Sequence, residues 1–163
     1  MVTGHGLTWN PTERVQAYTH PLWMAALTGL YFVTRDAYAT ALILGLSVSI
    51  VAVWLLLRRL AHEERAAMLS ITLLMLSRAF VDYATSGLEN PLTHLLLVLF
   101  CIRFFRSAAS PAKLLQLSFL ASLAGLNRLD TLALYLPPLL YVLAHLGISR
   151  RTLETVRAKM RRL

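Results

Sequence analysis

The chain has 163 residues, of which 57% are hydrophobic and only 15% are charged. Soluble domains are about half apolar and a quarter charged, so this composition argues against a soluble domain and favours a helical membrane protein. The net charge of +8 is typical of nucleic-acid-binding proteins. The basic residues, however, stand at the ends of long apolar runs, where they orient membrane helices, so we expect no nucleic-acid partner.

The first element in chain order is the polar segment GHGLTWNPTERVQAYTHPLW, which spans Gly4–Trp23. The apolar run Pro21–Val33 overlaps its end and forms only roughly 20 Å of helix, too short to cross a membrane comfortably. Its length and the aromatic residues Trp23, Tyr31 and Phe32 favour a helix that lies along the membrane interface, with Trp23 as an anchor. We therefore predict that residues 1–37 are an extracytoplasmic loop with an interfacial helix. If Pro21–Val33 crossed the membrane instead, the polar segment would be cytoplasmic.

The following apolar runs approach the roughly 20 residues that a membrane-spanning helix needs. They predict an all-α fold, namely a polytopic membrane helix bundle over residues 38–148, with about five transmembrane helices plus the interfacial helix near the N-terminus. The runs are Tyr38–Leu57, Ala66–Ala84, Pro91–Phe105, Leu114–Asn127 and Thr131–Ile148. The third and fourth are short, and local thinning of the bilayer would let them cross. Pro137 and Pro138 predict a kink in the fifth.

The loops between these runs alternate between strongly basic and nearly neutral. Basic residues follow the first, third and fifth runs, and residues 149–163 form a basic tail with amphipathic helical spacing. Cytoplasmic loops carry an excess of lysine and arginine, so the basic loops and the tail are predicted to be cytoplasmic. The polar segment and the other acidic loops are then extracytoplasmic.

Three segments carry a resemblance to a known family. They are the Gly4–Trp23 segment, ATSGLENPL (Ala84–Leu92) and LNRLDTLAL (Leu126–Leu134). Together, and in this order, they resemble signatures of polytopic GT-C class glycosyltransferases that use polyprenyl-phosphate sugars, similar to mycobacterial terminal arabinofuranosyltransferase-like proteins. In the third segment, Leu129 replaces the proline of the family pattern and Thr131 replaces the glycine. The resemblance covers nearly the whole chain, but only the amino-terminal region of a typical member.

This resemblance implies a fragment of a membrane glycosyltransferase that transfers a sugar from a polyprenyl-phosphate donor to an extracytoplasmic cell-envelope acceptor at a bacterial plasma membrane. The implied partners are membrane lipid, the polyprenyl-phosphate-linked sugar donor and a glycan acceptor. In the family, an aspartate that acts as base or holds a metal precedes Gly-His-Gly-Leu, and a divalent metal is the only cofactor that the full-length enzymes imply. That segment has no counterpart before Gly4, so we expect this chain to be inactive alone, with its catalytic residues unknown. The alternative is a non-catalytic integral membrane protein, degenerate or an assembly partner, that keeps the scaffold.

Donor binding needs cations for a phosphate, which arginine binds through its forked donors, and carboxylates that can activate a hydroxyl. The candidate substrate-binding residues, all on the predicted extracytoplasmic side, are Glu13, Arg14, Tyr18, Glu89, Arg128 and Asp130. The five histidines show no spacing typical of metal ligands, so the residues present predict no metal site.

Each candidate also has a structural interpretation. Glu13 and Arg14 can be a solvated loop pair, and Tyr18 a membrane-interface anchor. Glu89 can mark a helix start, where a carboxylate is favoured. Arg128 and Asp130 can be a simple ion pair in a turn. Elsewhere, Arg78 and Asp82 are four residues apart on one predicted helical face and can neutralise each other.

Overall fold

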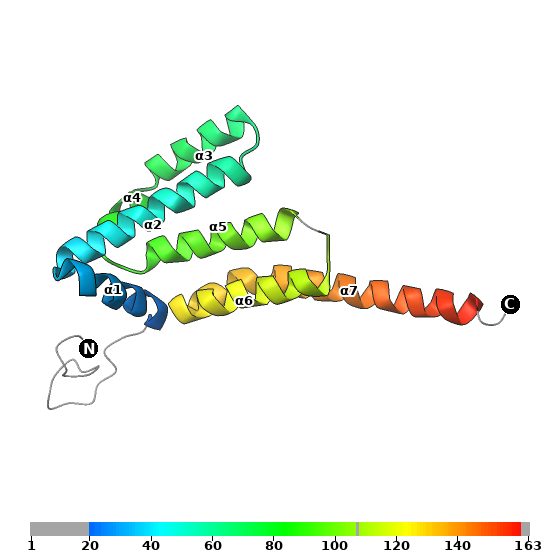
Figure 1. Cartoon of the computed structure of the whole chain (residues 1–163). Helices are drawn as coiled ribbons and strands as arrows, with labels where there is room; N and C mark the ends of the chain where they lie inside the picture. Colours follow the sequence, from blue (N-terminus) through cyan, green and yellow to red (C-terminus); the bar gives the residue numbers. More distant parts are fainter. Residues whose placement is uncertain (1–19, 107, 161–163) are drawn as a thin grey trace, which may run out of the picture.

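The computed structural model describes residues 20–106 and 108–160, with side chains as far as residue 147. Glu13, Arg14 and Tyr18 lie outside the described residues. The described part of the chain is helical apart from short connections, and it contains no strand. The all-α prediction is therefore confirmed for this part. Its helices are α1 (Pro21–Thr34), α2 (Ala37–Arg59), α3 (Glu64–Leu76), α4 (Arg78–Thr85), α5 (Asn90–Arg106), α6 (Pro111–Asn127) and α7 (Leu132–Met160), with a 3-10 turn η1 at Leu129–Thr131 (Figure 1).

Short polar residues start several of these helices. The Asp36 carboxylate accepts hydrogen bonds from the backbone N–H groups of Tyr38 and Ala39 at 2.8 and 3.0 Å and so caps α2. Ser110 caps α6 in the same way and is followed by Pro111, whose fixed φ suits the first helical position. These local signals explain why α2 and α6 begin where the apolar runs begin.

The core lies between α5, α6 and α7. Leu96 and Phe100 of α5 pack with Leu117 of α6 and with Tyr135 and Val142 of α7, all nearly or fully buried. The Phe100 and Tyr135 rings meet edge to face with centroids 4.8 Å apart, a favourable aromatic geometry. On the other side of α5 lies α2, and α1 contacts both α2 and α6. Figure 1 accordingly shows α1 beside the start of α2 and the end of α6.

The second apolar run, Ala66–Ala84, which was predicted as one span, is divided into two helices. α3 and α4 meet at Ser77 with a bend of 70°. The Ser77 backbone is extended, and its hydroxyl accepts a hydrogen bond from the Phe80 N–H at 3.3 Å, so Ser77 ends one helix and caps the next. Arg78 and Asp82 then form an ion pair at 3.3 Å with both side chains exposed, as their spacing predicts.

Among the described residues, two helical segments are long and apolar enough to cross a membrane, Ala37–Arg59 and Leu129–Gly147, and a third is added if α3 and α4 form one bent span. This finding agrees with an integral membrane protein. The predicted number of five spans is not confirmed, because α5 and α6 have 17 residues each. α1 is helical, as predicted, and its position at a membrane interface stays a prediction. α7 continues through Pro137 and Pro138 to Met160, so no helix end separates the last predicted span from the basic tail.

The bundle has an acidic end and a basic end. α2 and α5 run in the same direction, since Gly45 lies near Pro91, and Ala52 and Leu56 share a groove with Leu97. α6 runs back from the end of α5 to its start. One end of the bundle therefore gathers the acidic residues Asp36, Glu89 and Asp130, with Arg35 and Arg128 beside them. The opposite end gathers the basic residues Arg58, Arg59, Arg103 and Arg106, which outnumber Glu63 and Glu64 there.

Candidate functional site

Three chain segments that are far apart in sequence meet at the acidic end. They are the residue before α1, the turn before α5 and the turn after α6. We call the group that they form the polar cluster, and it consists of His20, Glu89, Asn90, Asn127, Arg128 and Asp130. Each member adjoins the end of an apolar helix, so the helix packing decides which polar residues meet.

Glu89 lies at the centre of the polar cluster and is only 5% exposed. One carboxylate oxygen, Oε1, lies 3.3 Å from Nη1 of Arg128 and 3.5 Å from Nε2 of His20. A buried carboxylate loses its hydration and depends on such partners. The backbone carbonyl of Glu89 also accepts from the Thr93 N–H in the first turn of α5. Glu89 thus stands at a helix start, as the structural interpretation predicts, while its carboxylate faces Arg128 and His20.

Arg128 connects Glu89 to the outside of the protein. Its Nη1 donates to Oδ1 of Asn90 at 3.1 Å, while its Nε and Nη2 donate to the two carboxylate oxygens of Asp130 at 3.1 and 2.7 Å. This hydrogen bonding with Asp130, helped by the negative charges of Asp130 and Glu89, raises the pKa of the Arg128 guanidinium and keeps it charged. The side chain of Asp130 is 65% exposed. The guanidinium therefore has a buried side that is held by the protein and an outer side that holds an exposed carboxylate.

Asn127 is the buried residue that links the polar cluster to α5 and to the residue before α1 by hydrogen bonds. It is 1% exposed, and its Nδ2 donates to the backbone carbonyl of Glu89 at 3.2 Å and to Oγ1 of Thr93 at 2.9 Å. Its own backbone carbonyl lies 2.7 Å from Nδ1 of His20. A carbonyl can only accept, so Nδ1 of His20 donates this hydrogen bond, and Nε2 on the other side of the ring faces the Glu89 carboxylate.

The Asn127→Leu change tests this linking role. Leucine removes both donors and leaves the Glu89 carbonyl short of one partner, so we expect the free energy of unfolding to fall by about 1 to 2 kcal/mol. The measurement is denaturation in mixed detergent micelles, followed by circular dichroism. Gln116→Leu is the control, because it removes an exposed amide from the same helix and is expected to change the stability by less than about 0.5 kcal/mol. Equal effects would show that the Asn127 hydrogen bonds contribute little.

The position of Trp23 differs from the one predicted. This residue was predicted to anchor the chain at a membrane interface, but it is only 5% exposed, and its Nε1–H donates to the Gly87 carbonyl at 2.9 Å. The indole thus fixes α1 to the turn that carries Glu89. A buried indole normally finds such a partner, which is why its polar atom points to a loop carbonyl here.

Of the six predicted site residues, the structure brings together Glu89, Arg128 and Asp130. The other three fall on the residues that it does not describe. His20, Asn90 and Asn127 also belong to the polar cluster and were not predicted as site residues. Each of the three lies within one of the segments that resemble the GT-C signatures, and each stands at the end of an apolar run. These two features together are the signal that could have identified them.

The polar cluster adjoins an apolar groove between α2, α4 and α5. Its volume is about 420 Å³, and Asn90, His94, Tyr83, Phe80 and Leu97 are among its lining residues. Asn90 belongs both to this groove and to the polar cluster, because its Oδ1 accepts from Arg128. A ligand with a long apolar part and a charged head could therefore contact both at once.

Within the part of the chain that the structure describes, no group of three or more His, Cys, Asp or Glu side chains is arranged to hold a metal ion. The polar cluster instead combines a cation, two carboxylates and neutral donors and acceptors. Its chemistry suits the binding of an anion at the outer side of Arg128.

Comparison with known proteins found no matching family model, no matching curated protein and no matching solved structure.

Proposed function

We propose that the chain contributes the donor-binding part of a membrane glycosyltransferase that uses a polyprenyl-phosphate-linked sugar and an extracytoplasmic glycan acceptor. The observation that carries the proposal is the convergence of three segments. The segments that resemble GT-C signatures are far apart in sequence, yet His20 from the first, Glu89 from the second and Arg128 from the third lie within 3.5 Å of a neighbour in the polar cluster. A chance resemblance would not require the three segments to meet.

Arg128 is the proposed phosphate ligand. Glu89 and Asn90 hold its Nη1, which orients the guanidinium, and Asp130 occupies the two donors that face outward. A carboxylate and a phosphate both fit this planar fork with two parallel hydrogen bonds. The exposed Asp130 carboxylate therefore marks where a donor phosphate would bind, and it is displaced when the phosphate arrives.

The adjoining groove is the proposed position of the first isoprene units. It reaches Asn90 at the polar cluster and continues between apolar side chains of α2 and α5. A ligand in this groove would place its apolar chain among side chains such as Leu97 and Phe80, and its phosphate next to Arg128. This arrangement favours a lipid-linked phosphate over a soluble one.

The proposed topology keeps five spans. The 17 residues of α5 or α6 give about 25 Å of helix, slightly less than the roughly 30 Å of a hydrocarbon core, a difference that local thinning can accommodate. The separation of acidic and basic ends supports an orientation in which the polar cluster is extracytoplasmic and Arg58, Arg59, Arg103 and Arg106 are cytoplasmic.

Binding of polyprenyl monophosphate to the purified chain tests the proposal, with uncharged polyprenol as the competing ligand. We expect Arg128→Lys to weaken binding about tenfold, because lysine keeps the charge and the Glu89 pair but loses the fork. Asp130→Asn is expected to strengthen binding, because it removes the carboxylate that competes for the same donors. Native mass spectrometry gives both affinities.

The matched control is Arg78→Lys, which changes an exposed arginine that is paired with an aspartate elsewhere. It is expected to leave the affinity unchanged. Equal binding of polyprenol and polyprenyl phosphate, or the same effect from Arg78→Lys as from Arg128→Lys, would contradict the proposal. Binding without sugar transfer in the presence of the acceptor would favour the alternative, a non-catalytic protein that keeps the donor site.

A further inference from the structure

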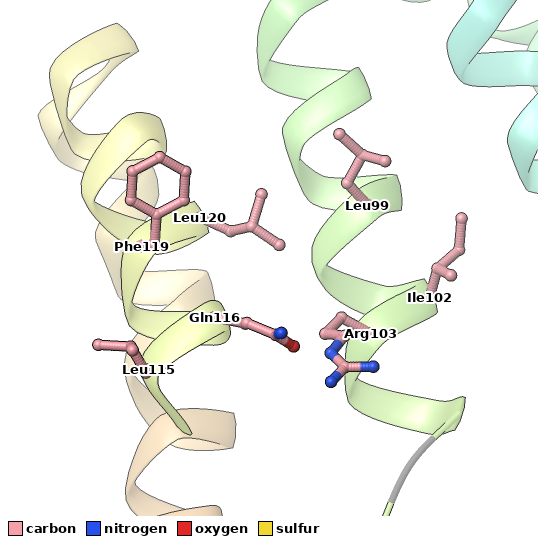
Figure 2. A pocket seen from close by; sticks show the side chains of 7 residues that line it. All are labelled: Leu99, Ile102, Arg103, Leu115, Gln116, Phe119 and Leu120. Atoms are coloured by element: carbon pink, nitrogen blue, oxygen red, sulfur yellow. The ribbon is translucent and has the colours of Figure 1, made fainter. Parts of the chain in front are cut away.

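A second groove lies between the second half of α5 and the first half of α6, toward the basic end of the bundle and away from the polar cluster. Figure 2 shows the side chains that line it, and its volume is about 650 Å³. Its walls are almost entirely apolar and include Leu99 of α5 and Phe119 and Leu120 of α6. Phe119 is 63% exposed and Leu115 is 72% exposed, so one side of the groove is open. The volume is in the range of ligand-binding pockets, roughly 300 to 1,000 Å³.

Two polar side chains stand in this apolar groove, one from each helix. In Figure 2 the Gln116 amide of α6 extends toward the Arg103 guanidinium of α5. Arg103 also interacts with other groups of the chain. The Arg103 side chain is only partly buried, so a ligand in the groove can reach it.

The surroundings of this groove are basic. Arg103 lies in the last turn of α5, together with Arg106. Lys113 in the first turn of α6 adds a buried positive charge, since it is 5% exposed and its Nζ donates to the Phe104 carbonyl at 2.6 Å. Among the described side chains, the carboxylates that belong to the polar cluster, Glu89 and Asp130, lie at the other end of these two helices. The groove thus combines an apolar channel with nearby arginine side chains and with the Arg103 and Gln116 donors at its edge.

We propose that this groove binds an anionic phospholipid, with one acyl chain along Leu99, Phe119 and Leu120 and the phosphate at Arg103 and Gln116. An apolar channel alone would accept any lipid chain. Arginine and an amide at its edge select for a phosphate, and the positive surroundings favour a headgroup with a net negative charge over a zwitterionic one. A basic pocket between helices on the cytoplasmic side of a bundle is a site of this kind. The site is separate from the polar cluster, and it rests on the proposed orientation, in which the basic end of the bundle is cytoplasmic.

The test compares binding of phosphatidylglycerol and phosphatidylcholine to the chain purified in a neutral detergent, with bound lipids counted by native mass spectrometry. We expect the wild-type chain to retain phosphatidylglycerol preferentially. Arg103→Gln is expected to reduce the affinity for phosphatidylglycerol about fivefold and to leave the weak binding of phosphatidylcholine unchanged. Arg59→Gln is the matched control, because it removes an exposed arginine from the same end of the bundle but outside the groove.

A second variant separates loss of the site from loss of the fold. Leu120→Trp fills the channel and keeps every charge, so it is expected to remove the tightly bound lipid while the circular dichroism spectrum stays that of the wild type. Equal retention of the two lipids by the wild type would overturn the proposal. Equal losses in Arg59→Gln and Arg103→Gln would also overturn it, since they would show a general attraction of basic residues to anionic lipid. Phosphatidylglycerol binding is measured apart from polyprenyl monophosphate binding and with other variants, so either proposal can be contradicted without the other.

Discussion

Replacing Arg128 with methionine is expected to cause the largest loss of stability among single changes in the polar cluster. The Glu89 carboxylate is 5% exposed and would lose the cation that lies 3.3 Å away. Breaking a fully buried ion pair costs about 3 to 5 kcal/mol. The side chain of Arg128 is 33% exposed, so water screens part of the interaction. We therefore expect the free energy of unfolding to fall by about 2 to 3 kcal/mol, measured by titration from a neutral detergent into dodecyl sulfate.

The control for this change is Arg78→Met. Its side chain is 93% exposed, and its partner Asp82 is 61% exposed. Exposed ion pairs contribute about 0 to 1 kcal/mol, so this variant is expected to unfold almost like the wild type. The double variant Glu89→Gln with Arg128→Met is expected to recover part of the loss, because the uncompensated buried charge is gone. Similar stabilities for Arg78→Met and Arg128→Met would show that Glu89 does not depend on Arg128.

The second large effect is expected at Gly45, where α2 passes closest to α4. A Cβ atom on Gly45 would lie 2.7 Å from the backbone carbonyl oxygen of Ala84, closer than real Cβ contacts. A backbone oxygen cannot rotate away as a flexible side chain can, so α2 must move from α4 and from Pro91 of α5. We expect Gly45→Ala to lower the free energy of unfolding by about 2 kcal/mol, within the range that overpacking costs.

Gly29→Ala is the matched control, since a Cβ there meets nothing within 4 Å. Alanine is favoured over glycine inside a helix by about 1 kcal/mol, so Gly29→Ala is expected to stabilise the chain slightly. The two changes add the same atom and are expected to have opposite signs in the same detergent titration. A stabilising Gly45→Ala would mean that α2 and α4 do not pack closely in the membrane.

Local features of the fold could be predicted from the sequence. The apolar run Tyr38–Leu57 became α2, Ala37–Arg59, because length, hydropathy and the Asp36 cap all act within the segment. The two ion pairs of short spacing, Arg78 with Asp82 and Arg128 with Asp130, are present as their spacing predicts. The break at Ser77 was missed, because a serine within an apolar run is compatible with a continuous helix and becomes a cap only when the backbone turns.

The polar cluster could be predicted only in part. Its members Glu89 and Arg128 were identified one by one, from a resemblance and from the predicted topology. Their contact depends on how α5 and α6 pack, which no local pattern encodes. His20 and Asn127 are 107 residues apart in sequence and share a hydrogen bond of 2.7 Å. Such a pair depends on the positions of α1 and α6. Trp23, which was predicted to be a membrane anchor, helps to fix α1, because its indole binds the turn before α5.

The most direct test of the central claim is a distance measurement between the donor phosphate and Arg128 in lipid vesicles. Solid-state NMR with ¹⁵N-labelled arginine side chains and a bound polyprenyl-phosphate sugar reports ¹⁵N–³¹P dipolar couplings. We expect a coupling that corresponds to about 4 Å between a guanidinium nitrogen and the phosphorus, the spacing of a guanidinium and a phosphate that share hydrogen bonds. Arg128→Lys is expected to remove this coupling, and Arg78→Lys is expected to keep it. A wild-type spectrum without this coupling, at full occupancy of the lipid, would contradict the assignment of Arg128 as the phosphate ligand.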